Sequence, residues 1–224
     1  MTALDATADG SAESGAHTEE AVAAQPAAVG PLAGDPAALG LPCFIMGAVA
    51  LGLSLAGVVP QAELGAPLAI ILGATSMGLI ITTIWAAALG QTAVAAIFGI
   101  FAAFWLSYFI LVTGLIRGWF GIAAVDVVAT VKLFLITWLI IVLMLTLATL
   151  RLPVAFTAVF VLVALTVLLV LLAYEQTPVS SGLLKTGGYV LLAAAAGGVY
   201  LFFNSLSLAT GGNALPLGRP TLKG

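Results

Sequence analysis

The side chains that could do chemistry in this 224-residue chain are few and lie far apart. The single histidine, His17, has no flanking metal ligands, so we expect a solvated side chain there. The single cysteine, Cys43, excludes an internal disulfide and a cysteine-rich metal site. After residue 35 the carboxylates are Glu63, Asp126 and Glu175, which do not form a pair, and this part of the chain has no histidine. We therefore predict that the chain is not an enzyme and binds no metal or cofactor.

Hydroxyl and amide groups are the other polar side chains inside the apolar stretches. They are Thr75, Ser76, Thr82, Thr83, Ser107, Thr137, Thr166 and Asn204. Hydroxyls in apolar helices usually donate to the backbone of their own helix, so we expect most of them to be structural. We select Thr82, Thr166 and Asn204 as candidates for the polar lining of a path. Such a path suits a small solute that needs little charge compensation.

Six long apolar segments must position these side chains. Hydrophobic residues make up 62% of the chain and charged residues only 7%, whereas a soluble domain has about 25% charged residues. A membrane-spanning helix needs about 20 apolar residues. The predicted spans cover residues 39–59, 67–89, 93–116, 125–150, 153–173 and 184–208. The predicted fold is therefore an all-α polytopic membrane protein with six transmembrane helices, in contact with membrane lipid.

The spans divide the chain into three parts. Residues 1–34 are acidic and small with few large apolar residues, so we expect a disordered acidic tail. We expect residues 35–218 to form a six-helix transmembrane domain and residues 219–224 to form a short C-terminal tail. Six spans place both termini on one side, which we expect to be the cytoplasm because the acidic tail then need not cross the membrane. No basic cluster indicates a nucleic-acid partner.

Three short motifs follow one another in a recognisable order. Residues 35–41 read DPAALGL at the start of the first span, and Phe104 and Trp105 form an aromatic pair in the third. Residues 213–218 read NALPLG after the last span. The set resembles the acetate–succinate transporter family of six-helix membrane proteins, which has NPAPLGL, a Phe-Trp pair and LPIG at these places. The likeness covers about residues 35–218.

The resemblance implies a substrate, an assembly and a constriction. The substrate would be a small monocarboxylate such as acetate, moved with protons or through a channel in the plasma (inner) membrane. The assembly would be a ring, a homohexamer, with a separate path through each protomer. The family's hydrophobic constriction of Phe, Tyr and Leu falls on Phe44, Phe101 and Leu165 of this sequence. Phe101 lacks the phenol of the family's Tyr, so the expected path is less polar.

The residues alone leave two other functions open. The first is a channel for a neutral solute such as ammonia or glycerol, which a path without carboxylates would also suit. The second is a membrane sensor or scaffold whose acidic tail recruits a partner. Moving a bare carboxylate past Phe44, Phe101 and Leu165 would be costly without a cation or donors nearby. We therefore expect the acid to cross protonated, or with its charge balanced by hydroxyl groups and helix N-termini.

Overall fold

The computed structural model describes residues 32–60 and 65–222, and the chain from Gly34 onward forms one compact unit. Most of the predicted acidic tail, including His17, lies outside the described residues, and so does Glu63. The unit is built from helices: α1 (Ala37–Leu55), α2 (Gly65–Ile70), α3 (Met77–Ala88), α4 (Thr92–Arg117), α5 (Val127–Ala148), α6 (Val154–Tyr174) and α7 (Ser181–Ala209).

Short irregular turns complete three of these helices. A π-helical turn, Ile71–Ser76, joins α2 to α3 so that the two run on as one span. Tighter 3₁₀ turns at Ala124–Asp126 and Thr149–Arg151 extend α5 at its two ends. The described residues then contain six helical stretches that are long and apolar enough to cross a membrane. This confirms the predicted all-α fold with six spans.

Span boundaries differ from the predicted ones by up to a few residues. The last helix begins at Ser181 because the side chain of Ser180 caps it and accepts a hydrogen bond from the Leu183 amide at 3.4 Å. The first helix ends at Leu55, ahead of Pro60, and Gly57 there adopts a positive φ of 80°. Capping chemistry, which hydropathy does not register, thus sets these ends.

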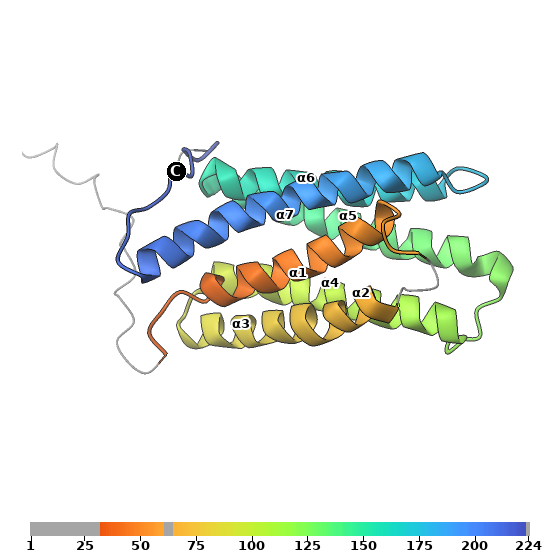
Figure 1. Cartoon of the computed structure of the whole chain (residues 1–224), viewed down its shortest axis with the longest axis horizontal. Helices are drawn as coiled ribbons and strands as arrows, with labels where there is room; N and C mark the ends of the chain where they lie inside the picture. Colours follow the sequence, from red (N-terminus) through yellow and green to blue (C-terminus); the bar gives the residue numbers. More distant parts are fainter. Residues whose placement is uncertain (1–31, 61–64, 223–224) are drawn as a thin grey trace, which may run out of the picture. The chain divides into compact units, whose positions relative to one another are not determined.

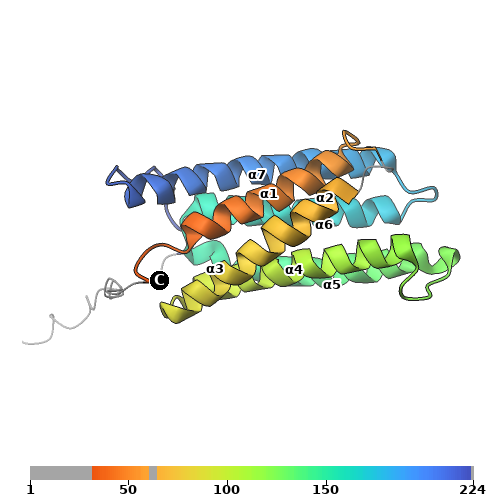
Figure 2. The same cartoon turned by 60° about the horizontal axis from the view of Figure 1, so that its bottom comes forward.

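Figure 1 and Figure 2 show α1 lying beside α7, and α3 beside α4, in agreement with the helix contacts. In addition, α7 packs on α6, and α6 packs on α5. Successive spans alternate in direction, so the bundle has two ends, which we call the Asp35 end and the Lys185 end. At the Asp35 end the start of α1 and the last turns of α7 are joined by a hydrogen bond of 2.6 Å from Ser205 Oγ to Asp35 Oδ2.

The segment after α7 folds back across the Asp35 end. The phenol of Tyr200 donates to the Pro216 carbonyl at 2.9 Å, and the side-chain carbonyl of Asn204 accepts from the Leu215 amide at 2.8 Å. The amide of Ala155 on α6 donates to the Leu217 carbonyl at 3.1 Å. The motif at residues 213–218 therefore ties α7 to the α5–α6 turn.

Close packing of α1 on α7 depends on glycine. A Cβ atom on Gly188 of α7 would lie 2.6 Å from the Ala56 amide nitrogen and 2.7 Å from the Gly52 carbonyl oxygen, both backbone atoms. Backbone atoms in a helix have little freedom to move aside. The two helices can therefore approach this closely only while residue 188 has no side chain.

Replacing Gly188 with Ala should destabilise the protein by about 1–3 kcal/mol, because the added methyl group forces α1 and α7 apart. Thermal unfolding of the purified protein in detergent measures the effect. Gly73→Ala is the matched control, since a Cβ there would meet nothing within 4 Å. Equal melting temperatures for the two variants would show that the α1–α7 contact is looser than described.

Candidate functional site

A cavity of about 650 Å³ lies between the helices. It begins at Phe44 and Phe101 in the middle of α1 and α4 and extends toward the Lys185 end. Apolar side chains form most of its wall. Its polar lining residues are Ser54, Trp105, Tyr108, Thr166, Tyr174, Ser181 and Lys185. Lys185, at the mouth, is the one charged residue in this lining, and no carboxylate joins it.

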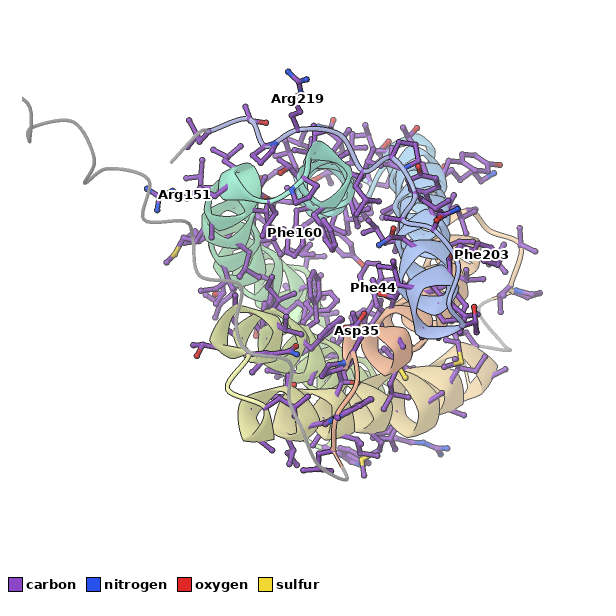
Figure 3. The ribbon with its side chains drawn as sticks, turned by 90° about the vertical axis from the view of Figure 1, so that its left-hand side faces the viewer. Asp35, Phe44, Arg151, Phe160, Phe203 and Arg219 are labelled. Atoms are coloured by element: carbon purple, nitrogen blue, oxygen red, sulfur yellow. The ribbon has the colours of Figure 1, made fainter. Side chains whose placement is uncertain are left out.

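Three phenylalanine rings pack together at the inner end of the cavity. Phe44 and Phe101 belong to the cavity lining, and Phe160 packs against Phe101 outside that lining. The rings of Phe44 and Phe101 meet edge to face with centroids 5.2 Å apart, and Phe160 of α6 contacts Phe101 at 5.5 Å. Each of the three side chains is at most 6% exposed. Figure 3, seen from the Asp35 end, shows Phe44 and Phe160 pointing toward the middle of the bundle, whereas Phe203 lies outside it. We call these three rings the aromatic girdle.

Two of the three predicted constriction residues, Phe44 and Phe101, are thus brought together, but Leu165 is not. Its side chain is 39% exposed on the outer face of α6 and does not line the cavity. The buried positions of α6 include Phe160, Val163 and Val167. These recur at helical spacing, and Leu165 falls between them on the opposite face. The α6 side chain whose ring contacts Phe101 is Phe160, which was not among the residues predicted from the sequence.

The predicted polar lining residues have different positions. Thr166 lines the cavity and donates to the Leu162 carbonyl at 2.9 Å. Thr82 is fully buried on α3, does not line the cavity, and donates to the Gly78 carbonyl at 2.8 Å. The side-chain carbonyl of Asn204 accepts a hydrogen bond from the Leu215 amide, so Asn204 links α7 to the C-terminal segment. Of the three, Thr166 alone faces the cavity.

An aromatic wall above the girdle was not expected from the sequence beyond the Phe-Trp motif. Phe104, Trp105 and Tyr108 follow Phe101 along α4 and all line the cavity. Phe104 also contacts Trp138 of α5, with ring centroids 5.2 Å apart. The signal was present in the spacing, because positions 101, 105 and 108 share one face of a helix.

Charges near the mouth are partly paired. Lys132 on α5 donates to Glu175 after α6 at 2.7 Å, with the two side chains 30% and 46% exposed. Such an exposed pair contributes little to stability. Lys185 makes no ion pair with any described residue, so its ammonium group is available to an anion at the mouth. No group of three His, Cys, Asp or Glu side chains that could hold a metal comes together within residues 32–60 and 65–222.

Comparison with known proteins gives a consistent result. The sequence model of the GPR1/FUN34/yaaH family matches residues 20–215. The solved structure of the bacterial acetate channel SatP has a similar fold, with a TM-score of 0.71 and 22% identity over 82% of this chain and 98% of that one. No curated protein matches the sequence. Since the family model covers most of the chain, this protein belongs to the GPR1/FUN34/yaaH family, the acetate transporter family that its motifs resemble.

Proposed function

We propose that this protein conducts a small monocarboxylic acid such as acetate across a membrane, through the cavity and the aromatic girdle of each protomer. One observation carries the proposal: a cavity with a single cationic residue at its mouth and no carboxylate in its lining ends on Phe44 and Phe101, and Phe160 packs behind Phe101. Membership of the family and the fold shared with an acetate channel support the substrate class.

Different protonation states suit different depths of the path. At the mouth, Lys185 attracts the carboxylate anion because opposite charges raise the local concentration of a ligand. At the girdle, Phe44, Phe101 and Phe160 offer no charge and no hydrogen bond, so an anion there would lose its hydration without compensation. The acid therefore passes the girdle protonated, and its flux carries a proton with each molecule.

The outer surface fits the proposed setting. Large apolar side chains such as Leu133, Leu147 and Ile84 are more than half exposed on the outside of the described helices. Lipid and neighbouring protomers would cover them. We propose a ring-shaped homohexamer in the inner membrane with both termini in the cytoplasm, and Leu165 belongs to this outer surface rather than to the path.

Uptake of labelled acetate into liposomes that contain the purified protein tests the proposal. We expect saturable uptake well above that of protein-free liposomes, with no comparable passage of ammonia or glycerol. Preferential passage of either neutral solute would instead support the alternative pore. A variant without residues 1–34 should transport normally, whereas loss of transport would point to a function that depends on the tail.

Replacing Lys185 with Gln should raise the KM for acetate by about twofold at low ionic strength, because the attraction at the mouth is lost. The difference from the unmodified protein should vanish at about 1 M salt, where charges are screened within about 3 Å. Arg219→Gln, at the opposite end of the bundle, is the matched control and should leave KM unchanged. A KM that is independent of Lys185 at every salt concentration would remove this residue from the entry route.

A further inference from the structure

We infer that Trp105 and Thr75 form a binding position for the carboxyl group of the acid, one helical turn above the aromatic girdle. The inference rests on the proposed function and adds the side chains that recognise the substrate. Trp105 follows Phe101 by four residues on α4, and Gly47 follows Phe44 by three on α1. Both lie on the cavity side of the girdle, since the cavity runs from there toward the Lys185 end and Trp105 lines it.

Gly47 brings the two polar groups to one place. A Cβ atom on Gly47 would lie 2.9 Å from Thr75 Oγ1 and 3.0 Å from Trp105 Cε2, the ring carbon bonded to Nε1. Any side chain at residue 47 would therefore occupy the space that the hydroxyl and the indole share. Trp105 lines the cavity, and Gly47 leaves room for the Thr75 hydroxyl, which is outside the lining, beside the indole.

Neither polar atom has a hydrogen-bond partner among the described residues, although both are buried. Thr75 is 0% exposed and Trp105 is 1% exposed, and Thr75 Oγ1 and Trp105 Nε1 are both unpaired. A third unpaired polar atom, Thr113 Oγ1, lies about two turns further along α4 and is not part of this pair. Of the pair, Trp105 lines the cavity, whereas Thr75 lies next to it outside the lining. Buried polar groups are nearly always paired, because an unpaired one costs folding free energy. Two such groups side by side at the end of a transport cavity point to a ligand.

The hydroxyl of Thr75 is unpaired for a local structural reason. Thr82, Thr137 and Thr166 each donate to the carbonyl four residues earlier, as hydroxyls in apolar helices usually do. For Thr75 that carbonyl belongs to Ile71, and it accepts instead from the hydroxyl of Ser76 at 2.8 Å. The π-helical turn Ile71–Ser76 creates this arrangement, and such turns are frequent at functional sites.

The two groups complement a protonated carboxyl group. The indole of Trp105 can only donate, which suits the carbonyl oxygen of the acid, and the hydroxyl of Thr75 can accept the O–H of the acid. A carboxylate anion would leave the acceptor capacity of Thr75 unused. Both atoms are covered in this structure, so the acid reaches them only after side chains of the cavity wall move aside. The pair would hold the neutral acid just before it passes between the rings.

Replacing Thr75 with Val tests the acceptor, because the two side chains have nearly the same shape. We expect the KM for acetate to rise about fivefold, the usual effect of one lost hydrogen bond, and the melting temperature to rise because a buried unpaired hydroxyl is removed. Thr75→Ser, which keeps the hydroxyl, should retain the original KM. The control Thr146→Val removes a hydroxyl that donates to the Val142 carbonyl at 2.7 Å and should leave KM unchanged.

Replacing Trp105 with Phe tests the donor, with Trp138→Phe as the control for loss of an indole elsewhere. We again expect a KM about fivefold higher. The double variant with Thr75→Val should show less than the product of the two effects, because both groups bind one carboxyl group. If the unmodified protein transports acetate and both single variants keep its KM, the inference is wrong and the proposed function stands. Absence of acetate transport by the unmodified protein would overturn both.

Discussion

Replacing Phe101 with Ala should increase acetate flux by about tenfold, which corresponds to about 1.4 kcal/mol off the barrier. Phe101 is the ring that contacts both of the others, Phe44 at 5.2 Å and Phe160 at 5.5 Å, so its removal opens the narrowest part of the path. The widened girdle should also admit longer acids such as butyrate, and the preference for acetate should fall. Initial rates of uptake of the two labelled acids into liposomes measure both effects.

Two further variants make the Phe101 result interpretable. Removing a buried ring costs about 3–5 kcal/mol of stability, so Phe101→Leu provides a milder version that should give an intermediate flux. Phe203→Ala is the matched control, because Phe203 is 56% exposed on the outside of α7 and does not line the cavity. Unchanged flux and selectivity in both Phe101 variants, with normal folding, would mean that the acid does not cross at the girdle.

Acetate flux should fall by roughly a hundredfold or more between external pH of about 5 and about 8 at constant total acetate. A simple carboxylic acid has a pKa near that of an aspartate or glutamate side chain, about 4, so its protonated fraction falls by about three orders of magnitude over this range. In the proposed mechanism, Lys185 concentrates the anion at the mouth and the girdle passes the neutral form. Initial rates at a series of external pH values, with saturating and limiting acetate, provide the measurement.

Protein-free liposomes are the necessary control in the pH series, because acetic acid itself crosses lipid. After that background is subtracted, rates that stay equal at the two extremes of pH would contradict passage of the protonated acid. The anion would then have to cross the girdle itself. That outcome would also count against Thr75 as an acceptor for the acid proton, while leaving the route through the cavity intact.

The architecture could be predicted from the sequence because each span satisfies a physical requirement that shows in composition. About 20 successive apolar residues with few charges are needed to cross a bilayer, and all six segments found in this way are helices here. Boundaries were less predictable, since Ser180 and Gly57 set them through capping and turn geometry rather than hydrophobicity.

The site could be predicted only in part. The contact between Phe44 and Phe101 agrees with the family resemblance, because motifs close to each in the sequence fix their positions, and their role as a constriction stays a prediction. Leu165 did not follow, since α6 is apolar on all sides and offers no periodicity that distinguishes the face of Phe160 from the outer face. Moving the predicted position by five residues, from Leu165 to Phe160, leaves the surrounding pattern of apolar residues almost unchanged.

The closeness of Trp105 and Thr75 could not be predicted from the sequence, for a different reason. Thr75 reads as one of several hydroxyls expected to donate to its own helix. Its lack of a partner depends on the π-helical turn and on Gly47 of another helix, neither of which hydropathy or spacing reveals.

The most direct test of the central claim is labelled acetate uptake into liposomes carrying the unmodified protein or its Phe101→Ala variant, measured side by side at an external pH of about 5. We expect saturable uptake above protein-free liposomes by the unmodified protein, and faster, less selective uptake by the variant. Uptake no greater than that of protein-free liposomes, from preparations that remain folded, would contradict the central claim.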